Sequence, residues 1–289
     1  MINKKGYFEG RETKRLFYQY WLPDSSNIKA YIIALHGWGT HSDRMEVPAE
    51  FLTENGYAVY AFDIRGHWRN ADNNPGHIDS MVHIQKDIVL FMDLVKKTSG
   101  DKKVFLMGHS FGGLIALVFA ANHPALPGVL VSSPLLRFAV NLSFSKKLGK
   151  KIAGPISKIS PTKTVEMVIE QNLLTSDIKI LRKHISDDKK LEKISLRSAA
   201  EMERAMKWAM ENASNLLCPT FIMQAGKDKM VEKGTTKEFF EKIKSKDKTY
   251  REYDGFLHEL WNEKGKAQVF RDMYVWLEKH IKKNNKNIK

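Results

Sequence analysis

The stretch Val104-Phe105-Leu106-Met107-Gly108-His109-Ser110-Phe111-Gly112-Gly113, followed by the apolar run 114–121, decides how this chain folds. Its first four residues are typical of a short buried strand, and the apolar run after the glycines is typical of a buried helix. Glycines two positions before and two after Ser110 leave room for a strand to reverse into a helix over a single residue. The sequence therefore predicts that Ser110 is presented on a sharp turn at the centre of the domain.

On either side of this stretch, short β-branched or aromatic runs alternate with amphipathic stretches, the pattern of strands joined by crossover helices. We expect strands over 15–20, 30–35, 57–63, 128–132, 220–225 and 249–253, and helices over 47–54, 83–97, 114–121, 235–244 and 266–281. This predicts an α/β fold with a mostly parallel central sheet and helices on both faces. Between 135 and 215 the pattern becomes helical and lysine-rich, so we expect 1–134 and 216–289 to form the core and 135–215 an inserted helical cap.

Length and composition exclude several classes of protein. A chain of 289 residues, 43% hydrophobic and 28% charged, can bury a large core without a structural metal. The single cysteine, Cys218, has no partner in the chain, and no zinc spacing accompanies it, which favours a reducing, cytoplasmic location. The N-terminus lacks the apolar stretch of a signal peptide, and no apolar run approaches the ~20 residues of a spanning helix.

The charge balance is strongly basic, with 47 Lys and Arg against 33 Asp and Glu and a net charge of +14. Such an excess favours anionic surfaces, whether nucleic acid, phospholipid or acidic substrate. No zinc finger, RNP-type strand or basic heptad pattern is present, so we expect no nucleic-acid partner. A solvated lysine-rich surface and a peripheral contact with an anionic membrane remain as the two interpretations.

A serine hydroxyl needs a base, and an acid to orient that base, before it acts as a nucleophile. His258 lies in a loop between the last expected strand and the last expected helix, and we expect it to be the base. Asp228 follows the strand 220–225 at the sheet edge where active-site loops gather, and is the expected acid. Asp254 is the competitor, although its place before Gly255 is typical of a turn residue.

The oxyanion of an acyl-transfer intermediate requires two backbone donors. Phe111 follows Ser110 and supplies one N–H, and the glycine-rich stretch His36-Gly37-Trp38-Gly39 can supply the other from Trp38. We interpret His36 as a hydrogen-bonding residue that shapes this loop.

At this point the chain resembles the α/β-hydrolases, and within them the monoacylglycerol lipase and lysophospholipase group. The matching pieces are His36-Gly37-Trp38-Gly39 with Thr40-His41-Ser42, Phe62-Asp63-Ile64-Arg65-Gly66-His67, Gly108 to Gly113, Ser132-Ser133-Pro134, Gly226-Lys227-Asp228 and Leu257-His258-Glu259. The resemblance implies Ser110 as nucleophile, Asp228 as acid, His258 as base, and a helical cap over the pocket. Relatives usually have a glycine where this chain has Trp68, and its ring is expected either to narrow the pocket or to reshape its entrance.

These observations predict a serine hydrolase that cleaves carboxylic esters of single-chain lipids, most of all monoacylglycerols. The alternatives are a lysophospholipase and a general short-chain carboxylesterase, with a peptidase of the proline-iminopeptidase type and a non-catalytic binding protein as more distant rivals. We expect His36, Gly37, His109 and Trp68 to contribute to substrate binding, with no metal or organic cofactor, and a monomeric protein.

Two cap patterns have competing interpretations. Apolar residues Leu142, Phe144, Leu148, Ile152 and Ile156 alternate with Lys146, Lys147, Lys150 and Lys151, which predicts either a helix that docks on a lipid surface or a cap helix packed on the core. Met202, Met206 and Trp208 could line an acyl pocket or belong to the core.

Overall fold

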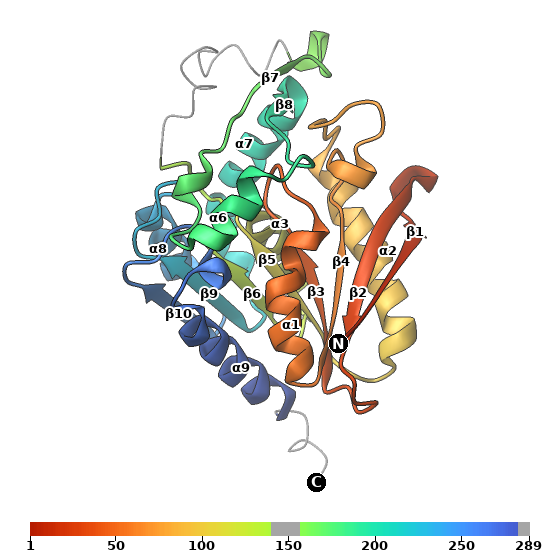
Figure 1. Ribbon diagram of the computed structural model, residues 1–289, viewed down its shortest axis with the longest axis vertical. Helices are drawn as coiled ribbons and strands as arrows, with labels where there is room; N and C mark the ends of the chain where they lie inside the picture. The colour runs from red at the N-terminus through yellow and green to blue at the C-terminus, as the bar shows by residue number, and fades with distance from the viewer. Residues whose placement is uncertain (140–156, 283–289) are drawn as a thin grey trace.

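The computed structural model describes residues 1–139 and 157–282, and in these ranges an eight-stranded sheet lies between two layers of helices (Figure 1). The strand order is β1-β2-β4-β3-β5-β6-β9-β10, and every neighbouring pair from β4 to β10 is parallel, whereas β2 pairs antiparallel with both β1 and β4. The strands are β1 (Ile2–Glu9), β2 (Arg15–Leu22), β3 (Ala30–Leu35), β4 (Tyr57–Phe62), β5 (Val104–His109), β6 (Val129–Ser132), β9 (Thr220–Ala225) and β10 (Lys248–Tyr253). The predicted mostly parallel α/β fold is confirmed.

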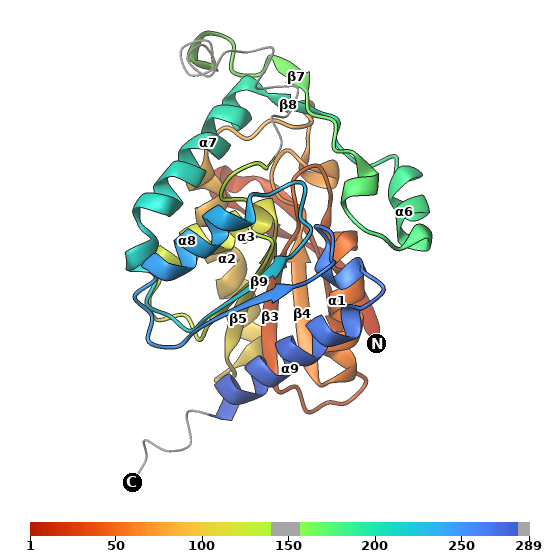
Figure 2. The ribbon, with the colours of Figure 1, turned by 90° about the vertical axis from the view of Figure 1, so that its left-hand side faces the viewer.

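Helices cover both faces of the sheet. Their bounds are α1 (Glu46–Glu54), α2 (Met81–Ser99), α3 (Phe111–Asn122), α6 (Ile178–Ile185), α7 (Leu196–Glu211), α8 (Lys233–Lys242) and α9 (Lys266–Lys282). One hydrophobic cluster joins α2, α3, α7 and α8 to one face, and the other joins α1 and α9 to the opposite face, an arrangement visible in Figure 2. Along β3, Ile33 and Leu35 enter the first cluster and Ile32 and Ala34 enter the second, as strand alternation requires.

The first strand is the element that sequence analysis missed. β1 pairs with β2 along its whole length, from Ile2 opposite Leu22 to Glu9 opposite Arg15. It lies at the sheet edge, and all of its residues except Phe8 are at least partly exposed. The polar run Asn3-Lys4-Lys5-Gly6 suits such an edge, where charge discourages pairing with other chains, but it lacks the apolar alternation that identifies a strand.

The segment that interrupts the core contains more than helices. Its described residues include a two-stranded antiparallel sheet, β7 (Thr164–Glu166) with β8 (Lys193–Ser195), in addition to α6 and α7. Met202 of α7 is buried in the core cluster, and Met206 and Trp208 pack against that cluster, so the core interpretation of these three side chains holds. The amphipathic stretch expected over 142–156 lies outside the described residues.

None of the helices in residues 1–139 and 157–282 combines the length and the hydropathy needed to cross a bilayer.

Candidate active site

The turn after β5 presents Ser110 in a strained backbone conformation. Its φ of 52° lies in the left-handed region, which a residue with a side chain adopts only when its surroundings enforce it. The glycines make this possible: a Cβ on Gly112 would lie 2.5 Å from the His36 carbonyl oxygen, and a Cβ on Gly108 would lie 2.8 Å from the Gly113 nitrogen. Ser110 caps the N-terminus of α3, where backbone N–H groups and the helix dipole favour a developing anion.

Asp228 and His258 meet beyond the ends of β9 and β10. His258 Nδ1 is 2.9 Å from Asp228 Oδ2 and 3.1 Å from Oδ1. Asp228 Oδ1 also accepts the backbone N–H groups of Met230 and Val231, at 2.9 and 3.0 Å, and Gln224 Nε2 donates to Oδ2 at 3.2 Å. With a carboxylate on Nδ1, that nitrogen carries the proton and Nε2 is left as the acceptor.

The neighbours of Asp228 keep this carboxylate ionised. Burial alone raises the pKa of Asp228, but the neighbouring His258 and the two backbone donors outweigh it and hold that pKa below its ordinary value. The competing carboxylate, Asp254, is exposed in the turn after β10. His109, whose ring centroid lies 4.8 Å from that of His258, is buried, which lowers its pKa to about 3 and keeps it neutral.

A small pocket of about 50 Å³ joins the candidate residues. Ser110, His258, Trp38, Gly37 and His109 all line it, which brings together residues from the ends of three strands at one edge of the sheet. The remaining lining residues are mostly apolar and come from the core and from the cap: Leu135, Phe138, Met167, Ile169, Leu174, Leu191, Met230 and Val231. The Ser110 hydroxyl makes no hydrogen bond with any residue in the described part of the chain, so it is free to contact a substrate.

The side chains of the two residues expected to supply the oxyanion donors pack together with a buried imidazole. The ring centroids of Trp38 and Phe111 are 5.4 Å apart, and His67 meets the Trp38 ring edge-on at 4.8 Å and stacks on the Phe111 ring at 6.4 Å. Phe111 is the first residue of α3, so its N–H has no partner within the helix. A Cβ built on Gly37 would lie 3.6 Å from the Ser110 Cβ, which brings the Trp38 loop next to the serine.

Two of the residues expected to bind substrate have other surroundings. His36 is fully buried, with Nδ1 2.8 Å from the Gly37 carbonyl oxygen and Nε2 accepting the Ile64 N–H at 2.9 Å, so its ring holds two loops together. Trp68 packs against His41 and the guanidinium of Arg69, and it is not among the residues that line the pocket. We therefore assign neither side chain to substrate contact, and the expected narrowing by Trp68 is not seen among the described pocket residues.

The loop that carries His258 is tied to the cap. Ser176 N–H donates to Glu263 Oε1 at 2.9 Å, and the same oxygen accepts the Leu257 N–H at 3.3 Å. Thr175 Oγ1 donates to the Asn262 carbonyl at 2.8 Å, and the backbone of Glu259 donates to that of Leu174 at 2.8 Å. Displacement of this cap segment would therefore pull on the loop that positions the candidate base.

Sequence reasoning missed the Arg, Lys and Glu side chains of the pocket: Arg44, Lys190 and Glu259. Glu259 adjoins His258 in the sequence, which is a signal that could have been used. Arg44 and Lys190 come from the turn before α1 and from the cap, and nothing in their sequence surroundings marks them. Gln224, which supports Asp228, was missed because it reads as an ordinary residue of a buried strand.

The chain is similar to several known proteins over most of its length. A family model described as serine aminopeptidase, S33, matches residues 26–265. Human monoglyceride lipase is 30% identical over 277 residues, covering 91% of this chain and 86% of that protein. Phospholipase YtpA of Bacillus subtilis is 28% identical over 264 residues, covering 90% of this chain and 100% of that protein. The crystal structure of Paleococcus ferrophilus monoacylglycerol lipase has a TM-score of 0.82 at 26% identity, covering 92% of this chain and 99% of that one. The chain therefore belongs to this family of serine hydrolases with the α/β-hydrolase fold.

Proposed function

We propose that the protein is a monoacylglycerol lipase that works through a Ser110-Asp228-His258 triad. The observation that carries the proposal is the 2.9 Å contact between His258 Nδ1 and Asp228, in a pocket that Ser110 shares with His258. The names of the relatives support an ester substrate, and the apolar lining supports an acyl chain as its acid component.

The proposed reaction has two steps, formation of the acyl-enzyme on Ser110 and its hydrolysis. His258 Nε2 takes the proton of the Ser110 hydroxyl as the oxygen attacks the ester carbonyl, and the N–H groups of Trp38 and Phe111 stabilise the oxyanion. The intermediate collapses, the C–O bond to the alcohol breaks, and His258 returns the proton to the departing alkoxide. A water molecule then gives a proton to His258 and attacks the acyl-enzyme, which releases the fatty acid and restores Ser110. Asp228 keeps the imidazole in the required tautomer.

The test is hydrolysis of 1-monoacylglycerols and p-nitrophenyl esters with two to eighteen carbons by the wild type and by Ser110→Ala. Loss of the nucleophile is expected to lower kcat on the order of a millionfold. Preference for medium or long monoacylglycerols supports the lipase, whereas activity confined to short esters supports a general carboxylesterase. Undiminished activity of Ser110→Ala, or failure of a fluorophosphonate to label Ser110, refutes the mechanism.

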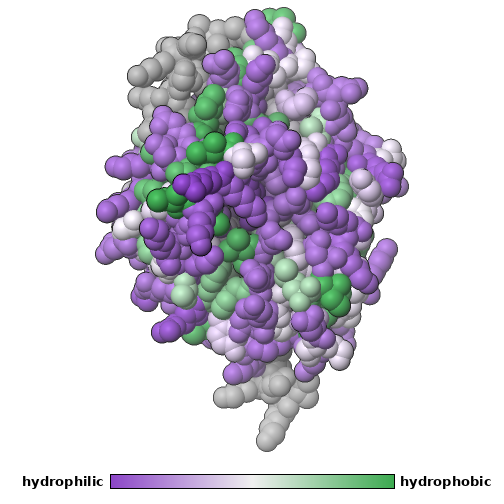
Figure 3. All heavy atoms as spheres, in the orientation of Figure 1, coloured by the Kyte–Doolittle hydropathy of each residue, from purple (hydrophilic) through white to green (hydrophobic). Residues whose placement is uncertain are grey.

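We also propose that the cap contacts an anionic membrane surface. Ile159, Ile178 and Ile185 expose 83%, 58% and 58% of their surface, and exposed cations, including Lys179 and Lys183, lie beside the two isoleucines of α6. Hydrophobic side chains gather among hydrophilic ones over the cap in Figure 3. Binding to vesicles with phosphatidylglycerol, but not to phosphatidylcholine vesicles, is expected at low salt in a flotation assay, and equal binding to both removes the electrostatic part of the proposal.

A further inference from the structure

The pocket contains a carboxylate beside the candidate base. Glu259 follows His258 in the chain, is 5% exposed, and lines the same pocket as Ser110. Its Oε2 accepts a hydrogen bond from Asn262 Nδ2 at 2.6 Å and lies 3.5 Å from His184 Nε2. Oε1 makes no hydrogen bond with any residue in 1–139 or 157–282. One oxygen of a side chain that lines the pocket is therefore free to accept a hydrogen bond from a ligand.

This carboxylate stays ionised despite its burial. Burial raises the pKa of Glu259, but the Arg44 guanidinium and the Asn262 hydrogen bond lower it, and the pKa lies below its ordinary value. An ionised carboxylate only accepts hydrogen bonds, so the group that it selects must be a donor.

The chemistry of the reaction places the alcohol portion of the ester on this side of the pocket. His258 must deliver its proton to the leaving oxygen, so that oxygen and its substituents lie next to the imidazole. Glu259 is the neighbour of His258, whereas the acyl portion has the apolar walls formed by Leu135, Phe138 and Met230.

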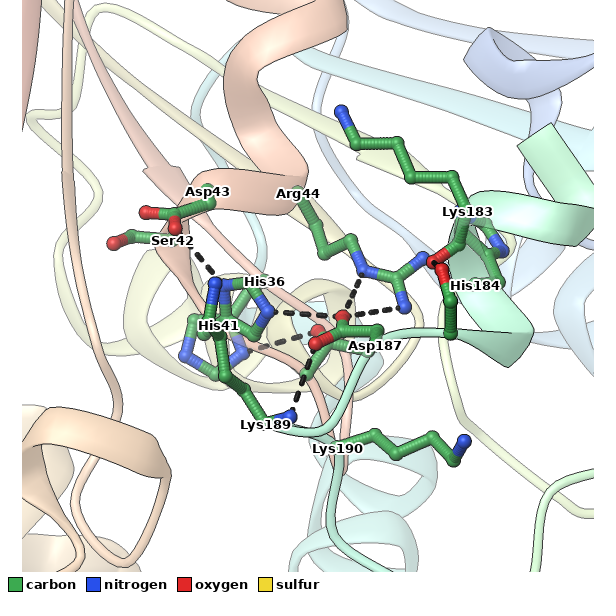
Figure 4. Close-up of polar contacts among 12 residues, drawn as sticks. His36, His41, Ser42, Asp43, Arg44, Lys183, His184, Asp187, Lys189 and Lys190 are labelled. Atoms are coloured by element: carbon green, nitrogen blue, oxygen red, sulfur yellow. Dashed lines mark hydrogen bonds and ion pairs between the residues drawn. The ribbon is translucent and has the colours of Figure 1, made fainter. Parts of the chain in front are cut away.

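Arg44 provides a donor on the same pocket wall. Its Nε and Nη2 both donate to Asp187 Oδ2, at 3.1 and 2.9 Å, as Figure 4 shows, while Nη1 is buried without a partner among the described residues. The fixed geometry of the guanidinium therefore leaves one directed donor to spare. Lys190 lines the pocket as well, and its Nζ donates to the Ile185 carbonyl at 2.9 Å.

This mixture of charges discriminates between classes of alcohol. A phosphate would be attracted by Arg44 and Lys190 but repelled by Glu259, and an ammonium group would be attracted by Glu259 but repelled by these two cations, so neither charge suits the whole set. A hydroxyl group both donates and accepts, so a neutral alcohol with several hydroxyls can satisfy the carboxylate and the guanidinium together.

We propose that Glu259 is a specificity-determining residue whose Oε1 accepts a hydrogen bond from a free hydroxyl of the alcohol portion, so that the enzyme selects esters of polyols over esters of simple alcohols. The proposal rests on the ester hydrolysis proposed above. A site built to hydrogen-bond a hydroxyl rejects the analogue that lacks it, because its own buried polar groups are then left without a partner.

The experiment compares three octanoate esters: 1-octanoylglycerol, its dimethyl ether 2,3-dimethoxypropyl octanoate, and propyl octanoate. The ether keeps the acceptor oxygens but has lost both donors. The wild type is expected to hydrolyse 1-octanoylglycerol with a kcat/KM about 10 to 100 times that of either analogue, the range expected of a hydrogen bond to a charged group. Equal rates on glycerol ester and ether overturn the proposal without the use of any variant.

Glu259→Gln tests the residue itself. This substitution is expected to lower kcat/KM for 1-octanoylglycerol about 10- to 100-fold while propyl octanoate stays within threefold of the wild-type value. His184→Gln is the matched control, because it removes the neighbour of Oε2 and leaves Oε1 in place, and it is expected to preserve the preference for glycerol. An equal fall for both esters in Glu259→Gln means that the residue is structural and overturns the proposal. Failure of the proposed function is distinct, since the wild type then hydrolyses none of the three esters.

Discussion

Replacement of Gly112 by alanine tests whether the sharp turn around Ser110 depends on a missing side chain. Helix propensity alone predicts that the substitution is stabilising, because Gly112 is the second residue of α3 and alanine is favoured over glycine in helices by about 1 kcal/mol. The structure predicts the opposite. The new Cβ would lie 2.5 Å from the His36 carbonyl oxygen and closer still to that of Leu35, and contacts under 3.0 Å are essentially absent from real proteins.

The loss of stability in Gly112→Ala depends on whether the atoms that the new Cβ would meet can move away. Both oxygens belong to the main chain at the end of β3, which pairs with β4 on one side and β5 on the other, so no rotamer change relieves the clash. Overpacking costs about 1 to 3 kcal/mol where side chains adjust, and a backbone clash belongs at the upper end or beyond it. With an unfolding entropy of about 2.1 cal/mol/K per residue, 3 kcal/mol lowers the Tm of a 289-residue chain by about 5 °C.

The chain offers a matched control in Gly234, which is also the second residue of its helix, α8, and has nothing within 4 Å of an added Cβ. Gly234→Ala is expected to raise the Tm slightly, and Gly112→Ala to lower it by at least about 5 °C and to lower kcat because Ser110 is displaced. Thermal unfolding followed by circular dichroism, with kcat measured on p-nitrophenyl octanoate, gives both numbers. A Gly112→Ala variant within 1 °C of the wild type and fully active would refute this account of the turn.

Three further predictions follow from the polar groups. Asp228→Asn is expected to lower kcat about 10⁴-fold with little change in KM, because the imidazole loses its required tautomer; a loss below tenfold contradicts the proposed acid. Burial lowers the pKa of His36 and of His67 from 6.5 to about 3, so between these two values the unfolded chain binds protons that the folded chain does not. The free energy of unfolding is therefore expected to decrease by about 1.4 kcal/mol for each residue and each pH unit as the pH is lowered. A urea midpoint that is as high at pH 5 as at pH 7 contradicts this. Asp187→Asn is expected to cost about 3 kcal/mol, since it leaves a nearly buried guanidinium without its carboxylate, whereas the exposed Asp188→Asn is expected to change stability by less than about 0.5 kcal/mol; equal urea midpoints for the two variants refute the difference.

The fold was predictable because its signals are local. Strand β9 was expected over 220–225 and has those bounds, since six consecutive buried residues follow a proline and precede a glycine. Helix α3 begins three residues earlier than expected, because Phe111 and the two glycines after it can adopt helical angles although their composition reads as a turn. The edge strand β1 was missed because its stability comes from pairing with β2, which the polar side chains do not reveal.

The candidate site also contains some residues that the sequence predicts and others that it does not. Ser110, Asp228 and His258 were identified because each follows a strand, and a parallel sheet brings the carboxyl ends of its strands to one edge. Arg44 and Glu259 could not be found from periodicity, because their role depends on how the cap packs over the core.

The connection between cap and catalytic loop gives a reason for this arrangement. Glu263 holds the Ser176 and Leu257 backbones together, and the main chain of Glu259 bonds to that of Leu174, a pocket residue. The pocket holds only about 50 Å³, so entry of an acyl chain requires the cap side chains that line it to move. The same short loop carries His258 and Glu259, the proposed polyol acceptor. A displaced cap would therefore move both residues, and return of the cap would restore the positions of the base and of the head-group site at the same time. Chemistry is thereby coupled to occupancy of the alcohol side of the pocket, which favours turnover of esters that fill it.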